Sequence, residues 1–323
     1  MKDHINFPFR SASHLALMHV VNDCGAWDRQ NLEVDYDKYI GRSDAHKMIP
    51  SGEIEFTSGN HVSTYAARAH GDNWVYLGQT LNYNRVSLVT RMDAGINSIA
   101  DVKGKKVGTR GRHPGLNDWL LLKQNGLDED RDDFEFVSFG TFATEERFKN
   151  MDMLAAISTK EVDCSLIPEP KRTFAKNNGF KVIELPPQPM ILHTTVSSSM
   201  PFVQKNPQIV ERVLKGLLDG IAYFKQERDA TIKIIQTRHT REGILDLATA
   251  TNMYDDIASV LEPKLYASMD AIYNVYEEAK HQNKDAAKIH PLALWDFHKL
   301  REIDDTGYID NLYKNHPAIS KKK

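Results

Sequence analysis

The stretch NSIADVKGKKVGTRG, residues 97–111, is typical of a one-turn helix followed by a polar turn and a β-strand. The next segment, LNDWLLLKQNGL (residues 116–127), has apolar positions spaced as in an amphipathic helix, which is expected to end at Gly126. A strand that leads directly into a helix is the repeating unit of α/β proteins. These residues therefore predict a sheet covered by helices.

Strand-like and helix-like runs alternate on both sides of this stretch, which favours a mostly parallel sheet. Before it, we expect strands at 4–9, 32–39, 53–61 and the pair 74–80 and 85–91, with helices at 15–27, 43–52 and 61–71, all forming one α/β lobe. After it, we expect strands at 134–140, 162–168, 180–185 and 191–199, with helices at 146–161 and 171–179.

The remainder of the chain is expected to be nearly all helical. Asn206 and Pro207 supply an N-cap and a first-turn proline, and further helices are expected at 241–252, 254–281 and 292–305. The chain is expected to cross between two lobes near 91–98 and 188–194. Lobe 1 would comprise residues 1–96 and 192–323, including the C-terminal helices, and lobe 2 would comprise residues 97–191.

Charge and hydropathy exclude several classes of partner. The chain has 323 residues, and 41 Lys and Arg against 44 Asp and Glu give a net charge of −3. It therefore lacks the excess of positive charge that is typical of nucleic-acid-binding proteins. No run approaches the roughly 18 apolar residues of a membrane span. The sequence has no Gly-x-Ser-x-Gly motif around Ser58, which argues against a hydrolase nucleophile there, and no Walker-type loop for a nucleotide.

Cysteine usage bears on the compartment. Cys24 and Cys164 are too few for a disulfide framework, and buried thiols in a reducing compartment are the expected state, although an exported protein could carry the same pair. The apolar run HLALMHVV is too short for a signal peptide and contains His19. We therefore expect a cytoplasmic protein unless a leader was removed.

Five segments follow one another in an order that is typical of a known family. They are GAWDRQNLEVDYDKY (25–39), GEIEF (52–56), DVKGKKV (101–107), VDCSLIPEP (162–170) and SSSMPFVQKNPQIVERVLKGL (197–217). This succession resembles the type 2 periplasmic-binding-protein fold, and within it the branch of sulfonate-, nitrate- and thiamine-pyrimidine-binding proteins. The resemblance covers roughly residues 1–240 and implies a two-lobed α/β fold with an interlobe ligand crevice and C-terminal helices on lobe 1.

The resemblance also implies a function and a site. It implies a protein that binds a small organic anion, a carboxylate or sulfonate of aromatic or heteroaromatic type, as the solute-binding component of an ABC-type importer, with a permease as partner. Mapped onto this sequence, the ligand-binding residues would be Arg10, Ser11, His14, Ser58, Asn60, His61, Arg110, Arg112, His113, Glu169, His193 and Thr194.

The residues of one of these loops suit an anion on chemical grounds. Gly108, Gly111 and Gly115 allow the backbone to approach a ligand, and the start of the next helix favours negative charge by roughly 0.3 to 1 kcal/mol. Arg110 and Arg112 add charge-assisted hydrogen bonds. The alternative is a solvated basic turn that follows a strand.

The histidines of the predicted site offer a second chemistry. His14, His61, His113 and His193 could together bind a transition metal, because neutral imidazoles are good ligands for zinc, iron or copper. No short ligand spacing such as His-x-x-x-His supports that set. No cofactor is therefore expected, with the metal as the alternative.

An enzyme on the same fold is the alternative function. His113 and Glu169 would then be catalytic, as proton carriers in an aromatic-acid decarboxylase or another lyase. The fold class includes dihydroxyphthalate decarboxylases and the pyrimidine synthase of yeast thiamine biosynthesis, whose cysteine-rich run this chain lacks. For Glu169, an ion pair with Arg172 or Lys171 is the structural alternative.

Overall fold

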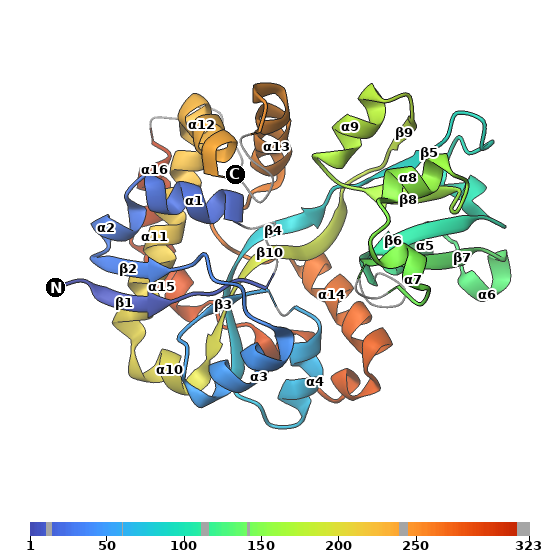
Figure 1. Cartoon of the computed structure of the whole chain (residues 1–323). Helices are drawn as coiled ribbons and strands as arrows, with labels where there is room; N and C mark the ends of the chain where they lie inside the picture. The colour runs from blue at the N-terminus through green and yellow to red at the C-terminus, as the bar shows by residue number, and fades with distance from the viewer. Residues whose placement is uncertain (11–14, 60, 111–115, 141–142, 239–244, 315–323) are drawn as a thin grey trace. The chain divides into compact units, whose positions relative to one another are not determined.

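The computed structural model describes residues 1–10, 15–59, 61–110, 116–140, 143–238 and 245–314, with His193 described by its backbone. The chain divides into two units: unit 1 is Met1–Asn84 with Pro189–Lys323, and unit 2 is Arg85–Gln188. The lobe boundaries expected from the sequence, 96/97 and 191/192, stay predictions. The C-terminal helices belong to unit 1 (Figure 1).

The strands of unit 1 form two small sheets. β1 (Asp3–Asn6) pairs with β2 (Leu32–Asp35) in parallel. The second sheet has the order β3 (Thr57–Ser58), β10 (Gln188–Ser199) and β4 (Trp74–Asn84), with β3 antiparallel to β10 (Figure 1). Isolated bridges from Phe9 to Tyr39 and to Ser58 join the ends of three strands at one place.

Helices surround these sheets and share one apolar core with them. Helix α11 (Pro207–Gln226) crosses α1 (Leu15–Asp23) and α2 (Ala26–Arg29) closely. A Cβ added at Gly216 would lie 2.5 Å from the Trp27 ring, and one added at Gly220 would lie 2.5 Å from Val21. Glycine is therefore required at both positions. The helices of unit 1 are α1 (Leu15–Asp23), α2 (Ala26–Arg29), α3 (Arg42–Ser51), α4 (Ser63–Ala69), α10 (Met200–Lys205), α11 (Pro207–Gln226), α12 (Arg228–Arg238), α13 (Leu247–Val260), α14 (Met269–Gln282), η4 (Lys284–Lys288), η5 (Pro291–Leu294), α15 (His298–Asp305) and α16 (Tyr308–Leu312).

Unit 2 has one mixed sheet of order β7-β6-β8-β5-β9. β6 is parallel to β7 and β8, whereas β5 is antiparallel to β8 and β9. The strands are β5 (Ser87–Thr90), β6 (Lys106–Arg110), β7 (Glu135–Phe139), β8 (Cys164–Ile167) and β9 (Lys181–Glu184). The helices are η2 (Ile99–Val102), α5 (Leu116–Gln124), α6 (Glu129–Asp132), α7 (Glu146–Lys149), α8 (Met153–Ser158) and α9 (Lys171–Asn177).

Several expectations about elements were wrong. Taken together, the sheets are mixed instead of mostly parallel. The single helices expected at 15–27 and 292–305 are each divided, into α1 and α2 and into η5 and α15.

The runs 74–80 and 85–91 do not pair in one lobe, because β4 joins the sheet of unit 1 and β5 joins that of unit 2. The helix expected at 146–161 is two helices, since the Asp152 carboxylate caps α8 by accepting from the Leu154 amide at 2.8 Å.

The single helix expected at 254–281 is also divided, into α13 and α14. The intervening segment hydrogen-bonds to β4: Gln79 N donates to Leu265 O at 2.7 Å, and Glu262 N donates to Thr80 O at 2.7 Å. These bonds satisfy backbone groups of β4, which a continuous helix could not do. Among the helices that the structure describes, none is long and apolar enough to cross a membrane.

Candidate functional site

The structure describes about half of the residues assigned to the site from sequence. Described in full are Arg10, Ser58, His61 and Thr194 in unit 1, and Arg110 and Glu169 in unit 2. His193 is placed by its backbone in β10. The predictions for Ser11, His14, Asn60, Arg112 and His113 lie outside the described residues.

Backbone bonds in unit 1 tie the ends of three strands together around Arg10. Phe9 N donates to Lys38 O at 2.8 Å, Ile40 N donates to Phe9 O at 2.9 Å, and Ser58 N donates to Pro8 O at 3.2 Å. These bonds hold Arg10 beside the residues that follow β2 and β3. The roles of Arg10 and Ser58 as ligand contacts, which the family resemblance implies, stay predictions.

The Arg10 guanidinium is held in a half-buried position. Its Nη1 donates to Ile40 O at 3.0 Å. Burial lowers the pKa of Arg10 below the ordinary value, and the neighbouring Tyr39 and Asp44 partly offset that effect. Gly59 has a φ of +90°, and a Cβ there would lie 2.9 Å from the Arg10 Cβ, so only glycine permits this approach. The Arg10 side chain is thus held by the hydrogen bond to Ile40 O at its guanidinium and by the close approach of Gly59 at its Cβ.

The β10 residues in this region are buried. Thr195 Oγ1 donates to Gln79 Oε1 at 2.6 Å, and Ser197 Oγ donates to Gly59 O at 3.2 Å, which fixes the turn after β3. Thr194 is fully buried, and its hydroxyl has no hydrogen-bond partner among the described residues. Its assignment as a ligand contact stays a prediction.

The turn that carries His61 lies on a buried aromatic cluster. Tyr76 Oη is 3.4 Å from the His61 carbonyl oxygen that it donates to, and it also bonds the Thr64 hydroxyl. Burial raises the pKa of the Tyr76 phenol well above the ordinary value, so the phenol stays protonated. Over the described part of the chain, no group of three or more His, Cys, Asp or Glu side chains could hold a metal ion.

In unit 2, the strand end at Arg110 is followed by a carboxyl group that sequence reasoning missed. Asp118 lies in the first turn of α5, and the Thr109 hydroxyl donates to its Oδ2. Burial raises the pKa of Asp118 to about 7, although the hydrogen bond from Thr109 opposes that shift. The sequence signal was an acidic residue in the first turn of a helix that follows a strand, but the arginines just before that helix favoured an anion site there.

Glu169 has the ion pair that was its structural alternative. Its side chain is 6% exposed, and Oε1 lies 2.8 Å from Arg172 Nε. It also accepts from the Thr173 hydroxyl at 3.0 Å and from the Thr173 amide at 3.2 Å. Lys171 instead pairs with Asp152. Both oxygens of Glu169 are therefore engaged, and its catalytic role stays a prediction.

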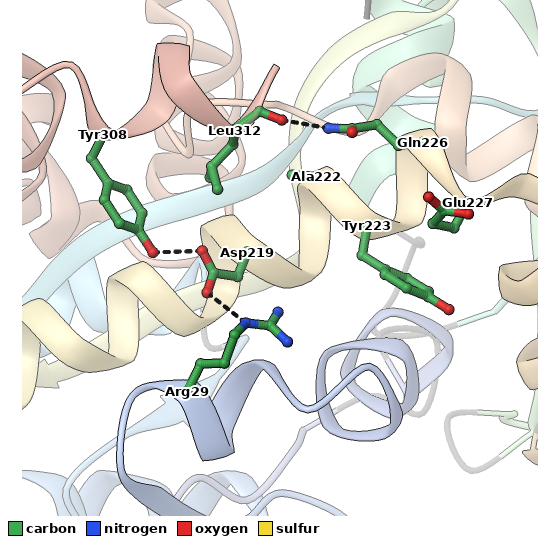
Figure 2. Close-up of a pocket in the computed structure, with 8 residues that line it drawn as sticks. All are labelled: Arg29, Asp219, Ala222, Tyr223, Gln226, Glu227, Tyr308 and Leu312. Atoms are coloured by element: carbon green, nitrogen blue, oxygen red, sulfur yellow. Dashed lines mark hydrogen bonds and ion pairs between the residues drawn. The ribbon is translucent and has the colours of Figure 1, made fainter. Parts of the chain in front are cut away.

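A pocket elsewhere in unit 1 lies among α2, α11 and α16 (Figure 2). Figure 2 shows the Asp219 carboxylate between Tyr308 and Arg29, with Tyr308 Oη donating at 2.5 Å and Arg29 Nε at 3.3 Å. Gln30 Nε2 donates to the same carboxylate at 3.3 Å. Burial and this acceptor raise the pKa of Tyr308. The donors leave Asp219 a structural role, which is to fasten α2 and α16 to α11.

Comparison with known proteins identifies the family. The model of the family described as NMT1/THI5 like matches residues 16–231. The chain belongs to the NMT1/THI5-like family. One curated relative, 4-amino-5-hydroxymethyl-2-methylpyrimidine phosphate synthase of Schizosaccharomyces pombe, is 32% identical over 84 residues. That match covers 26% of this chain and 24% of the relative, so the chain matches about a quarter of that protein's length.

Solved structures show the fold of this NMT1/THI5-like protein. The periplasmic sulfonate-binding protein SsuA from Methylobacillus flagellatus KT is similar at a TM-score of 0.70 and 17% identity, covering 96% of each chain. The periplasmic aliphatic sulphonate binding protein SsuA from Escherichia coli gives a TM-score of 0.65 and 16% identity over 91% of this chain and 99% of its own. The predicted periplasmic-binding-protein-like α/β fold is confirmed.

Proposed function

We propose that this protein binds a small organic anion, a carboxylate or a sulfonate, as the solute-binding component of an ABC-type importer. Its family membership supports this proposal, as do the structural neighbours, which are themselves sulfonate-binding proteins. The ligand is expected to contact residues at strand ends, where α/β folds bind small molecules.

The observation that carries the proposal is the fixed cation at the strand ends of unit 1. Arg10 is half-buried, and Ile40 O orients its guanidinium through a 3.0 Å hydrogen bond. A preoriented guanidinium presents its donors to a carboxylate or sulfonate without losing further side-chain freedom. Because water is partly excluded there, the attraction for an anion is stronger than at an exposed arginine.

Substitution of Arg10 tests this role. We expect Arg10→Met to weaken the binding of benzoate and of benzenesulfonate at least tenfold, because a partly desolvated, charge-assisted contact is lost. The affinity is measured by ligand-observed NMR titration, with thermal unfolding as the check on folding. Arg301→Met removes the same charge from an exposed ion pair with Asp305 and is expected to leave affinity unchanged.

The importer role is tested with the native ligand. Native mass spectrometry with metal analysis, applied to the protein purified from its source, is expected to reveal a bound organic anion that is released unchanged. Cells that lack the protein are expected to lose uptake of that anion. Unchanged uptake, or binding by Arg10→Met equal to that of the wild type, would contradict the proposal.

A lyase such as an aromatic-acid decarboxylase is the second candidate function, and Asp118 is the observation that favours it. Decarboxylation replaces a carboxylate on carbon by a proton, so the site needs a group that is protonated near neutral pH. The Asp118 carboxyl, whose pKa is about 7, meets that need better than Glu169, which is paired with Arg172. The curated relative is a synthase, which also supports an enzyme in this family.

Turnover separates this candidate from binding alone. If the protein is a decarboxylase, Asp118→Asn is expected to lower kcat while KM changes little, as followed by CO2 release from a panel of aromatic carboxylic acids. Glu169→Ala and His113→Ala test the two catalytic residues predicted from sequence. Binding without consumption of any acid in the panel excludes the enzyme and leaves the solute-binding proposal intact.

A further inference from the structure

One large aromatic side chain at the strand ends of unit 1 is exposed. Tyr39 is 61% exposed, whereas the adjacent Ile40 is 7% exposed and its bridge partner Phe9 is 4% exposed. The backbone around Tyr39 is fixed on both sides, since Phe9 N bonds Lys38 O and Ile40 N bonds Phe9 O. The ring is therefore presented to solvent from a rigid segment.

Among the described residues, the Tyr39 ring has one aromatic contact, and it is otherwise mostly exposed. The Phe9 ring packs against it nearly edge to face, with ring centroids 5.9 Å apart and an interplanar angle of 67°. This contact restricts the Tyr39 side chain and lowers the entropy lost when a ligand ring stacks on it. A preoriented aromatic surface is suited to binding another ring.

A cation lies beside this ring. The Tyr39 phenol is close enough to Arg10 to offset part of the effect of burial on that arginine, and Arg10 Nη1 is bonded to Ile40 O, the residue after Tyr39. Asp44 is the acidic group near the same guanidinium. An aromatic carboxylate or sulfonate has both the ring and the negative charge that this pair would recognise.

We propose that Tyr39 is a specificity-determining residue that selects aromatic over aliphatic anions, by stacking on the ligand ring while Arg10 binds the carboxylate or sulfonate. The inference rests on the proposed anion-binding function and names its ligand class. It adds a residue that the sequence analysis did not assign to the site.

Matched ligand pairs test the inference. Benzoate against cyclohexanecarboxylate, and benzenesulfonate against cyclohexanesulfonate, have similar size and charge but differ in aromaticity. Aromatic stacking predicts that the wild type binds the aromatic member of each pair about two- to tenfold more tightly. Tyr39→Leu is expected to abolish this ratio, whereas Tyr39→Phe, which keeps the ring, is expected to retain it.

Controls keep the two proposals distinguishable. Tyr273→Leu alters another exposed tyrosine, on α14, and is expected to leave the ratio unchanged. If neither member of either pair binds the wild type, the anion-binding function itself is wrong. If both members bind but the ratio is one, or if Tyr39→Leu preserves the ratio, the anion-binding function stands and the role of Tyr39 is overturned.

Discussion

Two carboxyl groups in unit 2 occupy corresponding places in the chain and differ in their partners. Asp118 follows β6 in the first turn of α5, and Glu169 follows β8 directly before α9. β6 and β8 are neighbouring parallel strands, so both groups belong to connections that leave the same edge of the sheet. Glu169 has a guanidinium, an amide and a hydroxyl as donors, whereas the Thr109 hydroxyl is the donor described for Asp118.

The contrast shows that the position after a strand does not determine the charge of a carboxyl group. A partly buried carboxylate is stabilised by the number and charge of its donors, and burial favours the neutral acid when those donors are few. Thus Asp118, with its pKa raised to about 7, is suited to exchange protons, and Glu169 is suited to hold the start of α9 in place.

The largest expected effect comes from breaking the ion pair on the Glu169 side. Arg172→Met leaves a carboxylate that is 6% exposed without its cation, which we expect to lower the free energy of unfolding by about 3 kcal/mol. Urea denaturation followed by circular dichroism measures the change. Lys171→Met removes a neighbouring lysine from its exposed pair with Asp152 and should cost less than about 0.5 kcal/mol. If the two substitutions lower the free energy of unfolding equally, the Arg172 ion pair contributes no more to stability than the exposed Lys171 pair, and this prediction is wrong.

Removal of the other carboxyl group is expected to stabilise the protein at high pH. The folded-state pKa of Asp118 is about 7 against an ordinary 3.8, so the folded state keeps a proton that the unfolded state loses as pH rises between these values. Wild-type stability should therefore fall across that window. Asp118→Asn lacks this loss. The full shift corresponds to roughly 4 kcal/mol, but Asp118 is only partly buried, so at pH 8 we expect the variant to exceed the wild type by about half of that, about 2 kcal/mol.

At pH 4, close to the unfolded-state pKa of 3.8, most of the contribution of Asp118 to the difference between the two proteins should be gone, and it should vanish below about pH 3, where the group is protonated in both states. The measurement is a series of urea melts of both proteins from pH 4 to pH 8. A difference that stays constant over this range would show that burial does not raise the Asp118 pKa.

The smallest expected effect comes from removing the hydrogen bond between Thr109 and Asp118. Thr109→Val removes the hydroxyl that donates to Asp118, and this hydrogen bond lowers the Asp118 pKa. We expect the pKa of Asp118 to rise by less than about one unit, as followed by the pH dependence of its side-chain carbonyl ¹³C NMR signal. A fall in this pKa would mean that another group controls the Asp118 charge.

Local sequence rules predicted many elements of the fold. Gly52, the last residue of the helix expected at 43–52, has a positive φ angle directly after α3. Gly126, expected to end the helix of residues 116–127, has a positive φ angle at the end of the turn after α5. Two of the errors were at places where long-range contacts decide the structure. Residues 261–268 are not helical, and their backbone forms hydrogen bonds with β4. Strand β5 does not pair with β4 and belongs to the other sheet, that of unit 2. Hydrophobic periodicity predicts neither the interruption of the helix at 261–268 nor the sheet to which β5 belongs.

The residues of the candidate site were proposed from the family resemblance, and their roles as ligand contacts stay predictions. The resemblance to binding proteins placed Arg10 and Ser58 among its ligand-contacting residues, and the structure brings the segments that carry them together at the strand ends of unit 1. Asp118 and Tyr39 were missed because their properties come from burial and exposure. Burial raises the pKa of the Asp118 carboxyl, for which the Thr109 hydroxyl is the donor among the described residues, and Tyr39 is exposed whereas its neighbours Phe9 and Ile40 are buried.

The order of segments along the chain has a consequence for biosynthesis. Unit 2 is one continuous stretch, Arg85–Gln188, whereas the sheet of unit 1 pairs β4 with β10, which lies on the far side of that stretch. On the ribosome, all of unit 2 is synthesised before β4 can meet its partner strand. The first half of unit 1 must therefore wait with unpaired strand edges, and chaperones are expected to bind the nascent chain at this stage.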